Sequence, residues 1–186
     1  SSIYRKELLE RLLLGFKVVK PDMEEIRIES ETAYDTASRL SEEKAKKVSS
    51  QFKEAIVIGC DQTAQFNNIQ IQKPLDYKTA LMQLKELSGK RVYFHSGICV
   101  YYDKGNIFQK KVISFDVKYK NLSLIEIESY LKKEKPFNCI GSIKSEGLGI
   151  SLLEEINSND PTAIIGLPLI TLVDMLKEVG VNVNGK

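Results

Sequence analysis

Acidic and basic side chains that could act together on a phosphate group stand in separate parts of the sequence. They are the acids Glu25, Asp61 and Glu146 and the cations Arg5, Lys6, Lys44 and Lys73. Cations neutralise phosphate charge, whereas a carboxylate can bind a divalent ion or accept a proton from water. The combination indicates attack by water on a phosphoanhydride.

Other catalytic chemistries find less support. His95 is the only histidine and lies inside an apolar run over residues 91–102, which favours a structural role. No Ser/His/Asp or Cys/His arrangement can be built around it, and no Walker-type loop or dinucleotide fingerprint is present. Cys60, Cys99 and Cys139 are odd in number and lack metal-ligand spacing. They are typical of buried free thiols in a reducing cytoplasm rather than of disulfides or zinc ligands.

Asp61 follows an uncharged run that includes Ile56, Val57 and Ile58. Such a run predicts a strand buried on both faces, as in a parallel or mixed sheet. Asp61 would then stand just past the carboxyl end of the strand, where open α/β sheets place ligands. The alternative is that Asp61 only caps the next segment.

The first residues form a polar, basic turn over 1–6 that leads into a helix over 7–13, ending at Gly15. Free N–H groups and the helix dipole could bind an anion there. Arg5 and Lys6 replace the acids that the dipole favours, so an anionic ligand could supply the negative charge. A solvated basic turn is the competing interpretation, and charge spacing alone favours it.

Periodicity and turn residues predict the remaining elements. A hairpin should turn at Asn67-Asn68, and a Ser-x-x-Glu capping box at Ser123 and Glu126 should open a helix. The glycine-containing loop over 141–150 indicates close approach to a ligand or merely tight turns. Further strands are predicted over 16–19, 91–102, 108–119 and 163–170, and further helices over 31–50, 77–87 and 169–178.

Length and charge bound the class of protein. The 186 residues, without repeats or a linker, predict one compact domain over 1–186. The near-balanced net charge of +2 argues against nucleic-acid binding, and no apolar run is long enough to span a membrane. No signal peptide is visible, and because the chain opens on Ser1 we expect residues to be missing before it.

A series of short motifs resembles the Maf proteins, a family of nucleoside triphosphate pyrophosphatases. The first is the Ser-x-x-Arg-x-x-Leu-Leu pattern over 2–9, and the others follow in order along nearly the whole chain. They are 21–25, 39–41 with Lys44-Ala45, 59–62, Lys73-Pro74, 87–89, Ser96-Gly97 and 166–169. The resemblance implies an α/β fold with a long, twisted, mixed sheet flanked by helices, two lobes around a deep cleft, and a homodimer.

Finer features resemble one branch, the 7-methyl-GTP pyrophosphatases. Gln62 stands where other branches have Thr, and the Cys-Ile-Gly-Ser-Ile-Lys-Ser-Glu-Gly run ends near Glu146. The resemblance implies a cytoplasmic hydrolase that cuts a nucleoside triphosphate between its α- and β-phosphates. A carboxylate such as Glu146 would suit 7-methylguanine, which carries positive charge.

The resemblance also implies a role for each matching position. Asp61 would accept the proton, and Arg5, Gln62 and Glu146 would set substrate choice. Ser2, Lys44 and Lys73 would bind phosphates, while Glu25 and Asp61 would hold a divalent metal ion, expected to be Mg2+.

Two departures from the family pattern keep alternatives open. Ile3 replaces a Pro in the first motif, and Gln72 replaces the Gly before Lys73-Pro74. One alternative is a Maf-type enzyme acting on dTTP, UTP, CTP or modified pyrimidine nucleotides. Another is a nucleotide-binding module that does not hydrolyse its ligand.

Overall fold

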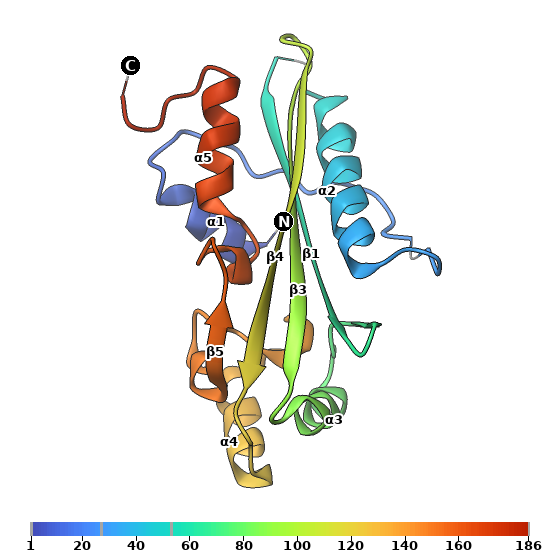
Figure 1. Ribbon diagram of the computed structural model, residues 1–186. Helices are drawn as coiled ribbons and strands as arrows, with labels where there is room; N and C mark the ends of the chain where they lie inside the picture. Colours follow the sequence, from blue (N-terminus) through green and yellow to red (C-terminus); the bar gives the residue numbers. More distant parts are fainter. Residues whose placement is uncertain (1, 27, 53, 186) are drawn as a thin grey trace. The chain divides into compact units, whose positions relative to one another are not determined.

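A computed structural model describes residues 2–26, 28–52 and 54–185 as an α/β protein (Figure 1). One five-stranded sheet has the order β2-β1-β3-β4-β5. The strands are β1 (Ile56–Phe66), β2 (Ile69–Ile71), β3 (Arg91–Tyr102), β4 (Ile107–Tyr119) and β5 (Leu153–Asn157). The helices are α1 (Ile3–Glu10), α2 (Ala33–Ser49), α3 (Tyr77–Leu87), α4 (Leu124–Glu134) and α5 (Leu169–Glu178), with 3-10 turns η1 (Ile140–Ser142), η2 (Leu148–Leu152) and η3 (Ala163–Ile165).

The sheet is antiparallel rather than mixed. β1 pairs with β2 in the register Gln65 to Gln70, and β4 pairs with β5. Asn67 and Asn68 take left-handed backbone angles at the β1–β2 turn, as the predicted hairpin requires. A short turn also joins β3 to β4. Turns this short can connect only antiparallel neighbours, which explains the pairs β1–β2 and β3–β4, and the expectation of a mixed sheet was wrong.

The chain forms two compact units whose division falls within three strands. The first unit comprises 1–62, 95–113 and 160–186, and the second comprises 63–94 and 114–159. Two units agree with the two lobes expected, whereas the deep cleft and the single domain over 1–186 stay predictions.

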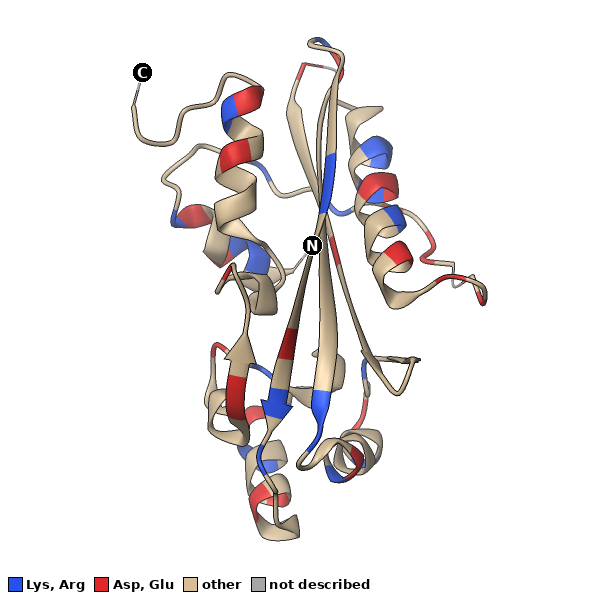
Figure 2. Cartoon of the chain, viewed as in Figure 1, with Lys and Arg blue, Asp and Glu red and all other residues tan. Residues whose placement is uncertain are grey.

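The first unit packs α1, α2 and α5 on strands β1 and β3. Leu8, Ile98 and Leu172 belong to one buried cluster, and Ala45 and Cys99 belong to a second. Acidic and basic residues alternate along α2 (Figure 2), and its exposed positions include Lys46 and Lys47. This helix is therefore apolar toward the sheet and charged toward water, as a surface helix of a globular protein should be.

The second unit packs α3 against α4 and η1. Its core includes the stacked rings of Phe94 and Phe115, with centroids 5.3 Å apart, and the buried Tyr119, whose hydroxyl donates to the Gly141 carbonyl at 3.0 Å. The capping box between Ser123 and Glu126 at the start of α4 is confirmed.

Four expectations about individual elements were wrong. Helix α1 begins at Ile3, so Arg5 and Lys6 lie within the helix and not in a turn before it. β1 continues to Phe66, so Asp61 lies within a strand and not just past its end. Residues 16–19 form no strand, and Phe16 and Val18 are exposed, because no neighbouring strand pairs with them among the described residues. Residues 163–165 form the 3-10 turn η3 instead of a buried strand, and the Gln62 side chain, far away in the sequence, donates to the carbonyls of Ala163 and Ile164. Within the described ranges, no helix is long and apolar enough to cross a membrane.

Candidate active site

Lys44 on α2 holds two carboxylates with one ammonium group. Its Nζ lies 2.6 Å from Oδ1 of Asp61 and 2.7 Å from Oε1 of Glu25. The Lys44 side chain is 12% exposed and that of Asp61 is 8% exposed, whereas that of Glu25 is 53% exposed. The cluster therefore runs from the interior to the surface, and its two acids outnumber its one cation.

The environment of Asp61 makes its carboxyl a better proton acceptor than an ordinary aspartate. Burial raises the pKa of Asp61, and the charge of Glu25 acts in the same direction. The charge and hydrogen bond of Lys44, and the charge of Arg5, oppose the rise without cancelling it. A carboxyl tuned upward in this way while held beside a cation is a common feature of catalytic sites.

Two glycines bring α2 close enough for Lys44 to reach Asp61. A Cβ atom on Gly59 would lie 2.2 Å from the Ser41 carbonyl oxygen, and one on Gly97 would lie 2.1 Å from the Ala37 carbonyl oxygen. Both obstacles are helix backbone, which cannot rotate away. The small residues Ala37, Ser41 and Ala45 follow one face of α2 at helical spacing, so this face lies directly on the strands.

Arg5 binds backbone on two segments far apart in the sequence. Its Nη1 donates to the Cys60 carbonyl at 2.9 Å, and its Nε donates to the Gly166 carbonyl at 2.8 Å. Ser2 caps α1, its Oγ accepting from the Arg5 backbone N–H at 3.5 Å. Arg5 thus lies next to the residue that precedes Asp61 and fixes the turn at Gly166.

Gln62 binds the same turn from the side of β1. Its Nε2 donates to the carbonyls of Ala163 at 2.9 Å and Ile164 at 3.1 Å, and to Ser96 Oγ at 3.1 Å. Ser96 Oγ in turn donates to the Ala163 carbonyl at 2.7 Å. These carbonyls fix which way the amide points, because only its NH2 group can donate to them. Two of the three side chains expected to set substrate choice, Arg5 and Gln62, both brace residues 163–166.

Asp160 and Thr162 brace this turn from within. Asp160 is buried, and its carboxylate accepts from the backbone N–H groups of Thr162 and Ile170 at 3.0 and 2.9 Å. Thr162 Oγ1 donates to the Leu167 carbonyl at 2.9 Å and accepts from the Leu169 N–H at 2.8 Å. The turn is therefore fixed before any ligand arrives.

The two predicted metal ligands face one cationic position. Glu25 and Asp61 both contact Lys44 Nζ, and no group of three or more His, Cys, Asp or Glu side chains forms a metal cluster within the described residues. Mg2+ in nucleotide enzymes typically binds one or two carboxylates and completes its shell with phosphate oxygens and water. This donor set fits such an ion.

His95 and the cysteines have the features of structural side chains. The His95 ring lies edge-on to Tyr34 at 5.7 Å, and burial lowers the pKa of its imidazole. All three cysteines are free, and burial raises the pKa of each thiol. Both observations agree with structural roles for these side chains.

Comparison with known proteins places the chain in a family. The family model described as Maf-like protein matches residues 1–179. The chain belongs to the Maf family.

Several relatives of this Maf protein carry the same name. Proteins named 7-methyl-GTP pyrophosphatase from Methylobacillus flagellatus, Nitrosospira multiformis and Burkholderia pseudomallei are 47%, 43% and 44% identical to the chain over 183 residues. The alignments cover 98%, 98% and 97% of this chain and 95%, 92% and 85% of the relatives.

Glu146 and Lys73 of the Maf chain lie in the second unit. Both side chains are exposed, and Glu146 accepts from Ser145 Oγ at 3.4 Å. Within the first unit, the structure brings Glu25, Lys44 and Asp61 together and places Arg5 and Gln62 on the turn over 163–166. That Glu146 and Lys73 act on the same substrate stays a prediction.

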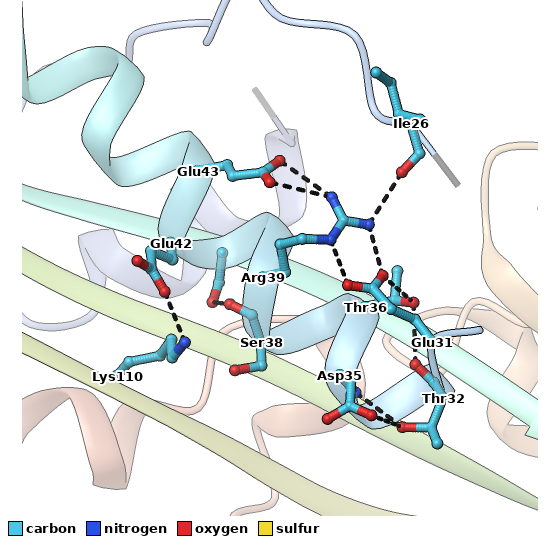
Figure 3. A network of polar contacts seen from close by, with 11 residues as sticks. Ile26, Glu31, Thr32, Asp35, Thr36, Ser38, Arg39, Glu42, Glu43 and Lys110 are labelled. Carbon is cyan, nitrogen blue, oxygen red and sulfur yellow. Dashed lines mark hydrogen bonds and ion pairs between the residues drawn. The ribbon is translucent and has the colours of Figure 1, made fainter. Parts of the chain in front are cut away.

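Sequence reasoning missed the residues that hold this Maf site in place. Arg39 on α2 binds Glu31, Glu43 and the Ile26 carbonyl (Figure 3). Arg39 and Ser96 each stood in a motif, but nothing in the sequence told which atoms they would bind. The Asp160-Pro161-Thr162 run was the one readable signal, because Asp and Thr around a proline are typical turn residues.

Proposed function

We propose that this Maf protein hydrolyses a nucleoside triphosphate between the α- and β-phosphates, giving the monophosphate and pyrophosphate. The observation that carries the proposal is the buried Asp61 carboxylate held at 2.6 Å by Lys44. Support also comes from relatives named 7-methyl-GTP pyrophosphatase that align over nearly the whole chain.

In the proposed reaction, water attacks the α-phosphorus and the bond from this atom to the bridging oxygen breaks. Asp61 accepts the proton that the water loses. Incoming phosphates compete with Asp61 and Glu25 for Lys44, so the ammonium turns from its carboxylates to the charge that builds on the pyrophosphate. The Asp61 carboxylate is thereby freed to accept the proton at the moment when substrate is bound.

Glu25 and Asp61 are the residues that would hold a divalent metal ion, which we propose to be Mg2+. Such an ion neutralises phosphate charge when it is bound. Their two negative charges against the single charge of Lys44 leave the cluster short of positive charge, which favours a cation there. Chelation by EDTA should abolish turnover, and added Mg2+ should restore it.

The preferred base is proposed to be 7-methylguanine. This base carries a positive charge, and Glu146 offers an exposed carboxylate that could accept from its N–H groups. The NH2 group of Gln62 donates to the Ala163 and Ile164 carbonyls. Gln62 would therefore contact the base through its side-chain oxygen, or influence it indirectly by holding the turn in place.

A pyrophosphate-release assay over 7-methyl-GTP, GTP, dTTP, UTP and CTP tests the proposal. We expect 7-methyl-GTP to give the largest kcat/KM, and Glu146→Gln to lower the preference over GTP by about tenfold, since the carboxylate charge attracts the cationic base and the amide has no charge. The matched control is Glu154→Gln, an exposed glutamate of β5. Preference for a pyrimidine triphosphate would assign the chain to another Maf activity, and binding without release would indicate a nucleotide-binding module.

Three further assignments rest on the family resemblance. They are phosphate binding by Ser2, Lys44 and Lys73, a homodimer, and a cytoplasmic location. Sedimentation of the purified protein tests the oligomeric state directly.

A further inference from the structure

Arg39 uses its whole guanidinium on a loop and a helix neighbour (Figure 3). Its Nε and Nη2 donate to the two carboxylate oxygens of Glu31 at 2.6 and 2.7 Å, and Nη2 also donates to the Ile26 carbonyl at 3.0 Å. Its Nη1 donates to both oxygens of Glu43 at 3.2 Å. The side chains of Arg39 and Glu31 are only 20% and 16% exposed, so this is a well-shielded, two-pronged ion pair.

These contacts hold residues of the loop that precedes α2 against the side of the helix. Glu31 accepts from Thr36 Oγ1 at 3.2 Å as well as from Arg39. Ile26 meets α2 at Arg39, and Glu25 meets it at Lys44. As the loop residue number falls from 31 to 25, the helix residue that it touches moves from Thr36 to Lys44. Arg39 stands in the middle of this path and binds the residue next to Glu25.

We propose that Arg39 is a positioning residue that holds Glu25 on Lys44, and through Lys44 sets the place of Asp61. The inference rests on the proposed function, because it concerns the same carboxylates. Arg39 holds the Ile26 carbonyl, which is one residue from Glu25, and Glu25 is the most exposed member of the Lys44 cluster. Without this anchor, Glu25 would spend part of its time away from Lys44.

Other ion pairs on α2 provide a contrast. Glu42 accepts from Lys46 at 2.6 Å, one turn along the helix, and from Lys110 on β4 at 2.6 Å. Neither pair includes the loop or a residue of the Lys44 cluster. Loss of Lys46 therefore removes an ion pair from the same helix without releasing Glu25, which makes Lys46→Ala the matched control for Arg39.

The test is a double-mutant cycle on 7-methyl-GTP hydrolysis with Arg39→Ala, Glu25→Gln and both changes together. We expect Arg39→Ala to lower kcat/KM by about 10–100-fold, the size of effect that a small misplacement in a site produces. In the Glu25→Gln background the same change should cost less than about threefold, because a residue that acts through Glu25 has nothing left to position. Lys46→Ala should stay within about twofold of the wild type.

Arg39→Lys keeps the charge but loses the two-pronged geometry, so it should restore only part of the lost activity. If Arg39→Ala does not fold, the same cycle is run with Arg39→Lys. Equal losses from the Arg39 change in both backgrounds would overturn the proposal, as would wild-type activity in both Arg39 variants. Failure of the proposed function has a different signature, since the wild-type protein would then release no pyrophosphate from any triphosphate of the panel.

Discussion

At the scale of single residues, one ammonium group decides what the two acids of the first unit can do. Burial raises the pKa of Asp61, and the charge and hydrogen bond of Lys44 oppose that rise by favouring the ionised carboxylate. Lys44 also neutralises part of the charge that would otherwise repel a triphosphate. An incoming phosphate group can form its first ion pair with the same lysine.

Removal of this ammonium group should therefore weaken both substrate binding and hydrolysis. We expect Lys44→Met to lower kcat/KM for 7-methyl-GTP by at least about 100-fold, a loss typical of a group that stabilises transition-state charge. Steady-state kinetics with Lys47→Met as the control checks this, because Lys47 is an exposed lysine of the same helix. A Lys44→Met enzyme within about fivefold of the Lys47→Met control would contradict this role.

Glu134 offers a residue-scale test of the second unit. It accepts from Lys144 Nζ and from the Leu148 N–H, both at 2.7 Å, and the Lys144 hydrogen bond, followed by that of Leu148, lowers the pKa of its carboxyl below the usual 4.5. A group whose pKa is lower in the folded state stabilises that state above its unfolded pKa. This stabilisation is lost as the pH falls through the folded pKa.

We therefore expect Glu134→Gln to lower the free energy of unfolding by about 1–2 kcal/mol at pH 7, with the difference from wild type shrinking as the pH falls below 4.5. Urea unfolding at several pH values measures it, with Glu154→Gln as the control. A difference that does not change with pH would show that the Glu134 charge is not the source.

At the scale of elements, the position of α2 depends on two glycines, which have no Cβ atom. Gly59 and Gly97 let the backbone of α2 lie directly on β1 and β3. At this short distance from the sheet, Lys44 reaches Asp61. A methyl group at either glycine would meet helix backbone. The helix would have to lift, and the Lys44 ammonium would lift with it.

Gly97→Ala should accordingly destabilise the fold by about 1–3 kcal/mol and also lower activity. Gly15→Ala is the control, since a Cβ there meets nothing within 4 Å, and it should change stability by less than about 0.5 kcal/mol. Thermal or urea unfolding and the pyrophosphate assay give both readouts. Unfolding energies that are equal for the two variants would mean that α2 does not need this close approach.

Element prediction succeeded where the signal is local and failed where partners lie far along the chain. The helix over 77–87 and the strand over 91–102 match α3 and β3, because length, periodicity and caps specify them. The strand β5 was missed, since Leu153–Asn157 is short, largely exposed and rich in glutamate. The strand expected over 163–170 was wrong because Gln62 and Arg5 bind its backbone from about 100 or more positions away, while Asp160 and Thr162 bind it from just before.

At the scale of the whole molecule, the order of the motifs was enough to predict the family and an α/β fold around a long sheet. Residue types could also indicate that Lys44 and Asp61 belong to one site. They could not reveal that Arg5 and Gln62 bind the turn over 163–166, because such contacts link segments about 100 or more positions apart. For the same reason the sequence could not reveal that Arg39 binds the Ile26 carbonyl, next to Glu25.

The most direct test of the central claim is pyrophosphate release from 7-methyl-GTP by Asp61→Asn, measured beside calorimetric binding of the same nucleotide. The amide fills the same space but cannot accept the proton, so turnover should fall by about 100-fold or more while the binding constant changes by only a few-fold. Turnover within tenfold of the wild type, with binding intact, would contradict the account of Asp61 as the proton acceptor.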